Sequence, residues 1–499
     1  MDLISFDYTA MLSGLLLVLD IELIMTVIVA VCVGLVFGAM PGITTSLCLT
    51  LFFPIALSLS TSSGFMLLLT LYSSTIVGAG AMAILFNIPG NPGAIASTFD
   101  GYPMSCSGKS YLALGIHLFS STAGSLISWL LILAFFVPLS YFASKLGSTD
   151  VLFITLLVIV LVGIMGQGQL IKSFFSGLLG LMISVNNVPF NQGEPVDILF
   201  ITYGDTLPLV IILVGLFSAP ELYKLSRKKT LLQSEQNFEE TSYRQLFNTS
   251  KILFTNKMTV TRASITGLIV GLLPSAGAAL SSMTAYFIEK KANKNQANFG
   301  HGEVAGVIAP ESANNASVAG SMLVLLLLGI PGSNSSAVIF GYLIEKGVPI
   351  GNQLYEAQSA VIYAVIFGGI LSTIILAAVS FSVAPYIARL VNLNNRLLLP
   401  ILISLVCFSA YFYRGYMGDV IILCLFGVVG FVMNKYKFPV ISLVLGLFLG
   451  KQFVKGIEDV QASLLSGHFS LFDKPFSLVL ATIILFLLFK HCIKWRPNR

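Results

Sequence analysis

Long apolar segments recur along nearly the whole chain, from Leu15 to Phe489, and short polar stretches separate them. An α-helix needs about 20 apolar residues to cross a bilayer. The pattern predicts roughly 12 such helices, with cores at 20–38, 64–86, 111–137, 151–166, 170–185, 207–219, 316–330, 355–380, 397–412, 418–434, 438–450 and 475–490. Two further stretches, 42–59 and 263–288, are predicted to be re-entrant hairpins, which enter the membrane and turn back.

The composition supports an all-α polytopic membrane protein. Of the 499 residues, 56% are hydrophobic and 10% are charged, and the mean hydropathy is +0.91. A soluble protein carries about 25% charged residues. The alternating segments of roughly ten residues that mark a membrane β-barrel are absent from the sequence. The first apolar segment has no basic region before it and no small-residue cleavage site after it, so we expect a retained helix.

The charged residues are concentrated in a few places. The segment 223–262 is the densest basic and polar stretch and the longest one without membrane character. Because cytoplasmic loops carry an excess of Lys and Arg, this segment and the basic tail at 490–499 are predicted to be cytoplasmic, and the acidic N-terminus outside. The chain is therefore divided into an N-terminal half (1–222), a cytoplasmic linker (223–262) and a C-terminal half (263–499). The same rule explains the net charge of +5, so no nucleic-acid partner is expected.

Two motifs occur in the same order in both halves. GLVFGAMPG at 34–42 is similar to GLIVGLLPS at 267–275, and SSTIVGAGAMAILFNIPGNPGA at 73–94 is similar to NASVAGSMLVLLLLGIPGSNSS at 315–336. The second alignment pairs Pro89 with Pro331, and it places Asn314, Asn315 and Ser317 opposite Tyr72, Ser73 and Thr75. If the N-terminus is outside, the two copies enter the membrane from opposite sides. We therefore predict two inverted repeats, an architecture common among secondary transporters.

Each copy of the second motif places Pro and Gly directly after a long apolar run. Pro89 and Pro331 each remove a backbone donor, and the adjacent Gly90 and Gly332 permit the dihedral angles that a break requires. A break at membrane depth frees carbonyl groups that can bind a cation, and it creates a helix N-terminus that can bind an anion. The alternative is an ordinary kink or, for the Gly-xxx-Gly pairs at 34–38 and 267–271, an ordinary contact between helices.

Other polar residues support weaker hypotheses. Asp100 and Glu311 are candidate intramembrane acids, for which we predict a loop position and the first turn of a helix, respectively. Asp205 and Asp419 lie in Gly-Asp pairs of the kind found in intramembrane aspartyl proteases, although their contexts differ and loop positions are expected. The four histidines form no cluster along the chain, and His117 is interpreted as a packed helix residue. The scattered cysteines lack metal-ligand spacing, and no phosphate-binding loop of an ATPase is present.

The chain resembles the large membrane subunit (the TctA type) of the bacterial tripartite tricarboxylate transporters. The resemblance extends from about residue 20 to beyond residue 450, and its most specific marks are MPG at 40–42, NIPGNPGAIASTFDGYPM at 87–104 and FGHGEVAGVIAPESANNASVAGSMLVLLLLGIPGS at 299–333. It implies a carboxylate transporter in the bacterial inner membrane that works with a small membrane subunit and an extracytoplasmic solute-binding protein. It also implies Na⁺ or H⁺ as the coupling ion and no other cofactor.

The two breaks and the positions that match the family motifs make up the predicted sites. The candidate substrate-binding residues are Thr44, Thr45, Asn87, Pro89, Gly90, Asn91, Gly93, Ser275, Asn314, Asn315, Pro331, Gly332, Ser333 and Asn334. The candidate ion-binding residues are Ser73, Ser74, Thr75, Gly90, Ser317, Gly332 and Ser335. Neutral hydroxyl and amide groups hold carboxylates by several hydrogen bonds, and their oxygens are hard ligands that suit Na⁺.

The sequence thus predicts an ion-coupled symporter for a di- or tricarboxylate, with its site between the two halves and membrane lipids around it. Two alternatives stay open. A passive anion channel would need no coupling ion and would not accumulate its substrate. An intramembrane enzyme would use Asp205 or Asp419 and is the less favoured of the two.

Overall fold

The computed structural model describes residues 8–40, 42–144, 147–165, 170–186, 196–198, 201–203, 208–227, 243–273, 276–349, 351–387, 395–465 and 475–494. These residues are almost entirely helical, as the apolar pattern predicts. The chain divides into two compact units, which take residues 1–139 and 221–412 (unit 1) and residues 140–220 and 413–499 (unit 2). Each unit therefore includes residues from both predicted halves. The two repeat halves themselves stay a prediction.

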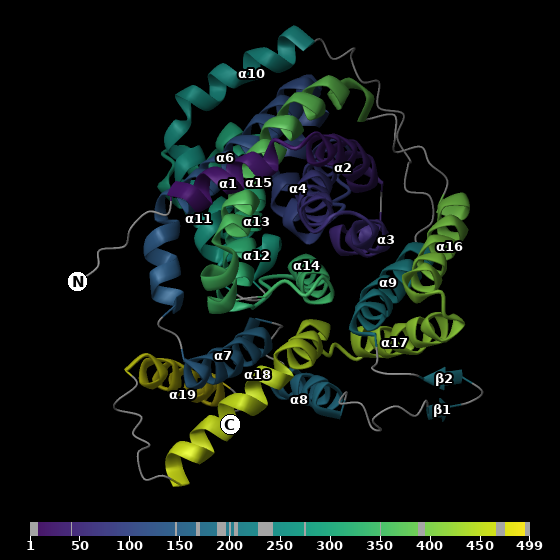
Figure 1. Ribbon diagram of the computed structural model, residues 1–499. Helices are drawn as coiled ribbons and strands as arrows, with labels where there is room; N and C mark the ends of the chain where they lie inside the picture. Colours follow the sequence, from purple (N-terminus) through teal and green to yellow (C-terminus); the bar gives the residue numbers. More distant parts are fainter. Residues whose placement is uncertain are drawn as a thin grey trace, which may run out of the picture. The chain divides into compact units, whose positions relative to one another are not determined.

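Unit 1 holds the helices that carry the predicted sites (Figure 1). Its elements are α1 (Tyr8–Val18), α2 (Ile21–Ala39), α3 (Thr45–Ser58), α4 (Thr61–Phe86), the 3₁₀ turn η1 (Pro92–Ala94), α5 (Ile95–Met104), the π-helical turn η2 (Ser105–Lys109), α6 (Ser110–Ser144), α10 (Tyr243–Thr255), α11 (Lys257–Gly271), α12 (Gly277–Ala292), the 3₁₀ turn η3 (Gln296–Asn298), α13 (Val304–Leu328), α14 (Asn334–Glu345), α15 (Asn352–Ile387) and α16 (Asn395–Arg414). Helices α6 and α16 end in residues of unit 2.

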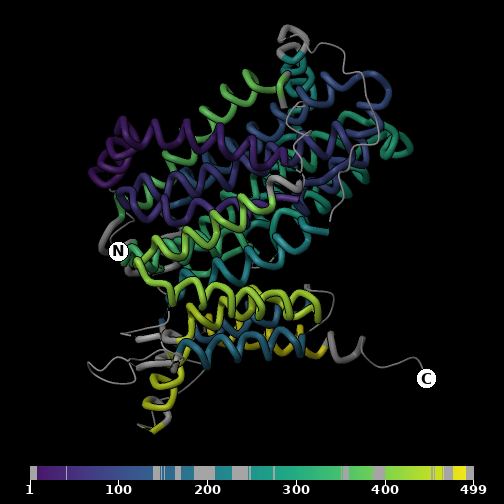
Figure 2. The backbone as a smooth tube through the Cα atoms, turned by 90° about the vertical axis from the view of Figure 1, so that its right-hand side faces the viewer, coloured from purple at the N-terminus to yellow at the C-terminus, as the bar shows by residue number. Residues whose placement is uncertain are grey.

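Two long helices, α4 and α13, form the centre of unit 1, and almost every residue along them is buried. Helices α2 and α3 pack on α4, and α11 and α12 pack on α13 in the same way. Figure 2 follows these helices as a tube, with the α2–α4 group purple to blue and the α11–α13 group teal to green. A helix that is buried on all sides needs no polar face. Both helices are accordingly largely apolar, and their other residues are mostly Gly, Ser, Thr and Asn, with Tyr72 in α4 and Pro310 and Glu311 in α13.

Glycines permit the close approach of the helices in each group. A Cβ atom at Gly34 or Gly38 of α2 would overlap with Ser74 or Thr75 of α4. A Cβ atom at Gly267 or Gly271 of α11 would likewise overlap with the α13 backbone, at Ala313 and Ser317. Small residues at such positions let helix backbones pack tightly inside a membrane. The two Gly-xxx-Gly pairs are therefore helix-contact sites, which is the alternative that the sequence left open.

Unit 2 contains α7 (Ser148–Met165), α8 (Leu170–Asn186), a strand pair, most of α9 (Leu209–Arg227), α17 (Met417–Lys435), α18 (Val440–Leu465) and α19 (Pro475–Lys494). The strands β1 (Val196–Ile198) and β2 (Ile201–Tyr203) pair antiparallel. Helices α8 and α18 are in contact through a hydrogen bond between the hydroxyl groups of Ser173 and Ser442, 2.7 Å apart. Gly180 lies against the backbone at Leu443 in the same contact. These small residues again allow two helices to approach closely.

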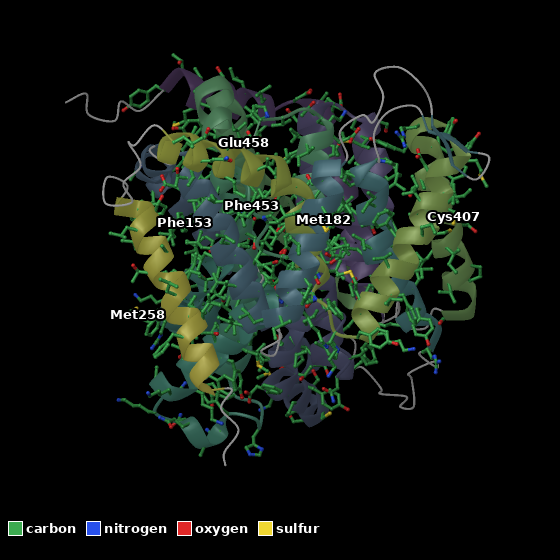
Figure 3. All side chains as sticks on the ribbon, turned by 90° about the horizontal axis from the view of Figure 1, so that it is seen from below. Phe153, Met182, Met258, Cys407, Phe453 and Glu458 are labelled. Carbon is green, nitrogen blue, oxygen red and sulfur yellow. The ribbon has the colours of Figure 1, made fainter. Side chains whose placement is uncertain are left out.

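Within the described residues, six helical stretches are long and apolar enough to cross a membrane: Ile21–Ala39, Thr61–Phe86, Pro92–Phe136, Leu209–Arg227, Ser359–Ala384 and Met417–Lys435. Seven shorter apolar helices accompany them. The protein is therefore a multi-pass membrane protein, although the predicted number of 12 spans stays a prediction. Many large apolar side chains face outward, among them Met182 of α8 and Met258 of α11 (Figure 3). Such side chains are suited to contact with lipid.

Three predicted boundaries differ from the structure. The predicted core 316–330 covers only the second half of α13, because the polar residues of APESANNAS lower the hydropathy of its first half. The predicted linker includes α10 and the start of α11, while residues 228–242 of it lie outside the described residues. The hairpin predicted at 263–288 consists of the end of α11 and most of α12.

Candidate substrate site at two interrupted helices

Both central helices end at the predicted breaks, residues 87–93 (the first break) and 329–334 (the second break). Helix α4 ends at Phe86, and Asn87 follows with a left-handed backbone at φ 57°. Helix α13 ends at Leu328, and Gly329 follows with φ 69°. These two residues are equivalent in the repeat alignment. A residue in the left-handed conformation ends a helix, and Asn and Gly are the residues that adopt it at least cost.

A new helix begins after each break, and equivalent residues cap the two. Asn91 caps η1 by accepting a hydrogen bond from the backbone N–H of Ala94, 2.9 Å from its Oδ1. Ser333 caps α14 by accepting from the N–H of Ser336 at 3.1 Å, and the Ser336 hydroxyl accepts from the N–H of Ser333 at 2.7 Å. The first four N–H groups of a helix lack partners within the helix. The N–H groups of Gly93 in the first break, and of Asn334 and Ser335 in the second, are therefore candidates for binding an anion.

Each central helix contributes one polar side chain to the break of the other half. The hydroxyl of Tyr72 on α4 lies 2.8 Å from the hydroxyl of Ser333 in the second break. Asn314 on α13 lies against Gly93 in the first break, where a Cβ atom would overlap with its Oδ1. Tyr72 and Asn314 are equivalent in the repeat alignment. The two halves of the chain thus meet at both breaks.

The amide groups around this contact have unused hydrogen-bonding capacity. Asn314 is fully buried, and neither its Oδ1 nor its Nδ2 has a hydrogen-bond partner among the described residues. Asn315 donates to the hydroxyl of Ser121 at 2.8 Å, but its Oδ1 has no partner there either. The same holds for Nδ2 of the buried cap Asn91. Buried polar groups are nearly always hydrogen-bonded, so a cluster of such atoms marks a place where a ligand or water is expected.

The predicted ion-binding hydroxyls are buried, and those on α4 and α13 are hydrogen-bonded within their own helices. Ser73, Ser74 and Thr75 donate to carbonyl groups one turn earlier on α4, and Ser317 donates to the carbonyl of Asn314 at 2.7 Å. A hydroxyl that donates its hydrogen keeps lone pairs for a cation. Ser335 lies 3.5 Å from Ser46 of α3, between the hydroxyl oxygens.

The remaining predicted residues are placed as follows. Thr44 caps α3 by accepting from the N–H of Leu47 at 3.3 Å, and Thr45 is buried in the first turn of that helix. Asn87 and Asn334 are exposed. Gly90 and Gly332 are buried and lie in matching positions, against the backbone carbonyls of Gly38 and Gly271. Ser275 lies outside the described residues.

The prediction of a loop position for Asp100 is wrong. Asp100 lies within α5 and is fully buried. Its Oδ1 accepts hydrogen bonds from the backbone N–H groups of Gly300, Gly302 and Glu303 at 2.8–2.9 Å, and its Oδ2 accepts one from Tyr286 at 2.9 Å. Gly101 and Pro103, which suggested a loop, are tolerated because α5 packs between other helices. Asp100 therefore joins two separate motifs, STFDGYPM and FGHGEV.

The prediction that Glu311 lies in the first turn of a helix is also wrong. Helix α13 begins at Val304, and Pro310 is inside it. Glu311 is fully buried and pairs with His117 of α6, with 2.7 Å between Nδ1 and Oε2. His117 is packed within its helix, as predicted, but sequence reasoning missed its partner. The two residues are far apart in the chain, and no local pattern connects them.

A model of the tripartite tricarboxylate transporter TctA family matches residues 24–445. The chain belongs to this family. It is 27% identical over 431 residues to the "Uncharacterized 52.8 kDa protein in TAR-I ttuC' 3'region" of Agrobacterium vitis, which covers 85% of this chain and 84% of the relative. It is 31% identical over 184 residues to the "Uncharacterized protein in TAR-II ttuC' 3'region" of the same organism, which covers 37% of this chain and 76% of that relative. No solved structure matches the chain.

Membership of the TctA family makes the chain a component of a tripartite tricarboxylate transporter, and it implies partner subunits. The family match includes both breaks, the Asp100 contacts and the His117–Glu311 pair.

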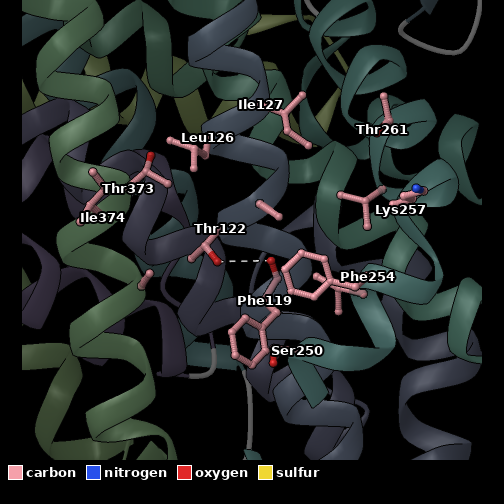
Figure 4. A pocket seen from close by; sticks show the side chains of 14 residues that line it. Phe119, Thr122, Leu126, Ile127, Ser250, Phe254, Lys257, Thr261, Thr373 and Ile374 are labelled. Carbon is pink, nitrogen blue, oxygen red and sulfur yellow. Dashed lines mark hydrogen bonds between the residues drawn. The ribbon is translucent and has the colours of Figure 1, made fainter. Parts of the chain in front are cut away.

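A cavity of about 440 Å³ lies between α6, α10, α11 and α15 (Figure 4). Its lining is almost entirely apolar, with Phe119, Leu126 and Phe254 on its walls and Lys257 as its single charged residue. An ionised carboxylate loses its hydration there without gaining enough partners. The cavity is therefore a poor site for a TctA substrate.

The structure describes one of the two aspartates of the enzyme alternative, Asp419. Asp419 is in the first turn of α17, not in a loop as predicted, and its carboxylate accepts from Nε of Arg414 at 2.9 Å. Asp205 lies outside the described residues. No group of three His, Cys, Asp or Glu side chains suited to a metal ion occurs in the part of the chain that the structure describes. The TctA family is a transporter family, which fits a protein that is not an enzyme.

Proposed function

We propose that the protein is the large subunit of a secondary active transporter, which imports a di- or tricarboxylate together with Na⁺ or H⁺. The observation that carries this proposal is the reciprocal contact at the two breaks, Tyr72 with Ser333 and Asn314 with Gly93. A carboxylate bound there would meet helix N-termini from both halves of the chain. Secondary transporters bind anionic substrates in this way.

The matched contacts also support the predicted repeat. Gly78 of α4 approaches the backbone at Leu35 of α2, and its equivalent Gly320 of α13 approaches the backbone at Leu268 of α11. The equivalent glycines Gly90 and Gly332 likewise make matching contacts, with the backbone carbonyls of Gly38 and Gly271. Repeats that share one packing pattern are suited to alternating access, in which one part moves against another around a fixed site. We propose that the two repeats are inverted.

Neutral groups are proposed to bind the substrate. Carboxylates are held well by backbone N–H groups at helix N-termini and by amide and hydroxyl donors. At the breaks, the N–H groups of Gly93, Asn334 and Ser335 and the free Nδ2 of Asn314 are such donors. A cation in the same region would be held by hydroxyl and carbonyl oxygens, for which Ser73, Thr75 and Ser317 are the candidates.

A small membrane subunit and an extracytoplasmic solute-binding protein are proposed as partners in the bacterial inner membrane. The binding protein would deliver the carboxylate from outside. The matching family, whose systems are tripartite, supports this arrangement.

The proposal is tested by reconstituting the large subunit, with its small subunit and binding protein, in liposomes. Uptake of a panel of labelled di- and tricarboxylates is then measured under an inward Na⁺ gradient, an inward H⁺ gradient or neither. We expect accumulation of a carboxylate above its external concentration under one of the gradients. Equilibration without accumulation would identify a passive channel, and no movement under any condition would refute both functions.

A further inference from the structure

His117 of α6 and Glu311 of α13 form a buried acid–base pair next to the predicted substrate site. Their Nδ1 and Oε2 atoms are 2.7 Å apart, and both side chains are completely inaccessible to solvent. The other ring nitrogen of His117, Nε2, lies 2.9 Å from the backbone carbonyl oxygen of Val77 on α4. We propose that this pair is the proton-binding site of the transporter, which makes H⁺ a coupling ion. The inference rests on the proposed function and selects between its two coupling ions.

The hydrogen-bond partners determine where the protons lie. The carbonyl oxygen of Val77 can only accept, so Nε2 of His117 carries a hydrogen. A neutral ring then has a lone pair on Nδ1, and an ionised Glu311 would face it with lone pairs as well. Two lone pairs at 2.7 Å repel each other, so one further proton lies on Nδ1 or on the carboxyl group. A contact of this length fits the form of the pair that holds this further proton.

The atoms between which this proton lies have few other partners. Neither carboxylate oxygen of Glu311, nor Nδ1 of His117, has a hydrogen bond of regular geometry among the described residues. In the described residues, the polar contacts of the pair are the one between Nδ1 and Oε2 and the one from Nε2 of His117 to the Val77 carbonyl. Loaded, it is neutral overall; unloaded, it carries one negative charge. A buried charge without a partner is strongly unfavourable, because the protein interior does not solvate it as water does.

A glycine of α4, Gly80, leaves room for the imidazole ring of His117. A Cβ atom at Gly80 of α4 would overlap with the imidazole ring of His117 and would lie 3.0 Å from Oε1 of Glu311. The glycine therefore lets the ring approach α4 closely enough to reach the Val77 carbonyl.

Other ionisable groups on the surrounding helices have partners of their own or lie elsewhere. Asp100 binds Tyr286 and a backbone loop, and Arg262 pairs with Glu289, with 3.3 Å between Nε and Oε2. Among the described residues, His117 and Glu311 have no ion-pair partner except each other. The remaining charged or titratable side chains described on helices α4, α6, α11, α12, α14 and α15 are Tyr72, Tyr111, Lys257, Lys290, Lys291, Tyr342, Glu345, Tyr363 and Tyr386, and Lys109 is the last residue of η2, directly before α6.

The pair lies close enough to Asn314 for its charge to affect the binding of a carboxylate there. Glu311 precedes Asn314 by three residues, which is nearly one helical turn or about 4.5 Å along α13. Asn315 of α13 lies four residues after Glu311, and Ser121 of α6 lies four residues after His117. Asn315 donates a hydrogen bond to Ser121, so the two helices are also in contact one turn beyond the pair. A negative charge on the unloaded pair would therefore repel a carboxylate bound at Asn314. Proton binding removes this repulsion, and by linkage the bound carboxylate strengthens proton binding by the same factor.

The experiment measures carboxylate uptake and internal pH together in liposomes that contain the complete system. In the wild type, we expect an inward pH gradient to drive accumulation, with acidification of the lumen that depends on the carboxylate. Glu311→Gln cannot release a proton, so we expect gradient-driven accumulation to fall at least about fivefold. Exchange of labelled for unlabelled carboxylate at equal pH should persist, because it needs no net proton movement.

The matched control is Glu289→Gln, which alters another buried carboxylate in an ion pair and should leave proton coupling intact. If Glu311→Gln does not fold, Glu311→Asp serves instead. Aspartate keeps a carboxyl group but places it farther from Nδ1 of His117. We therefore expect the pH dependence of uptake to shift.

Three outcomes separate the proposals. Carboxylate accumulation driven by Na⁺ alone, without lumen acidification, overturns the proton site and leaves the proposed function standing. Unchanged pH-driven accumulation in Glu311→Gln overturns it as well. A wild-type system that moves no carboxylate under any gradient refutes the proposed function itself.

Discussion

Tyr72 on the central helix α4 and Ser333 in the second break belong to different halves of the chain, and their hydroxyl oxygens are 2.8 Å apart. Ser333 is also the cap of α14, so this hydrogen bond ties α4 directly to the N-terminus that follows the second break. Asn314 makes the equivalent approach to the first break at Gly93. A substrate bound to the capped N-terminus would therefore be linked to both halves.

Tyr72→Phe removes this hydrogen bond and keeps the ring. We expect the concentration of carboxylate that gives half-maximal uptake to rise about 2- to 10-fold, because one hydrogen bond contributes about 0.5–1.5 kcal/mol. The matched control is Tyr342→Phe, which removes a 2.9 Å hydrogen bond to the carbonyl of Thr61 in the same unit. It should affect stability but not the half-maximal concentration. Equal effects of the two variants would contradict a role of Tyr72 at the site.

Asn314→Asp replaces a neutral buried amide with a carboxylate of nearly the same shape. If a carboxylate substrate binds there, repulsion between like charges at close range should weaken its binding about tenfold or more. Substrate-dependent thermal stabilisation of the purified protein measures the change in affinity. The control is Asn298→Asp, because Asn298 is exposed on η3. Undiminished stabilisation by substrate in Asn314→Asp would exclude Asn314 from the site.

Gly93→Ala introduces a methyl group where Asn314 and Ala278 leave no room. The added Cβ would lie 2.8 Å from that of Ala278 and would overlap with Oδ1 of Asn314. Overpacking of this kind costs about 1–3 kcal/mol, so we expect a lower melting temperature and a loss of uptake. Gly147→Ala is the control, since its new Cβ would make only ordinary contact, 3.8 Å from Asp150. Normal uptake in Gly93→Ala would contradict this prediction, because it would show that the residues of the first break can shift without loss of transport.

Asp100→Ala leaves three backbone N–H groups and the hydroxyl of Tyr286 without their acceptor. We expect a loss of stability of about 3 kcal/mol or more, because hydrogen bonds to a charged group contribute about 1.5–3 kcal/mol each. Asp100→Asn should be milder, since its amide oxygen can still accept from Gly300, Gly302 and Glu303. Thermal unfolding of the detergent-solubilised protein gives the comparison. Identical melting temperatures for the two variants would mean that these hydrogen bonds contribute little.

Much of the fold and part of the candidate site could be predicted from sequence. Pro89 and Pro331 marked both helix ends correctly, because a proline after a long apolar run has few structural alternatives. The first half of α13 was not predicted. Its polar residues lower the local hydropathy, and only the packing of α11 and α12 against it shows that they are buried. Asp100 was misplaced for a similar reason, because Gly101 and Pro103 are typical of loops and the contacts that hold α5 in a helix come from residues 200 positions away.

The sequence by itself determined that this is a helical membrane protein of the TctA family with two interrupted helices. These features follow from local patterns, since apolar length and the backbone restrictions of Pro and Gly act within a few residues. Only the tertiary structure decided which side chains meet. Tyr72 reaches Ser333, Asn314 reaches Gly93, and His117 reaches Glu311, because helices from distant parts of the chain pack closely where glycines allow it. Burial then gives these contacts their strength, since a polar group without water depends on the few partners around it.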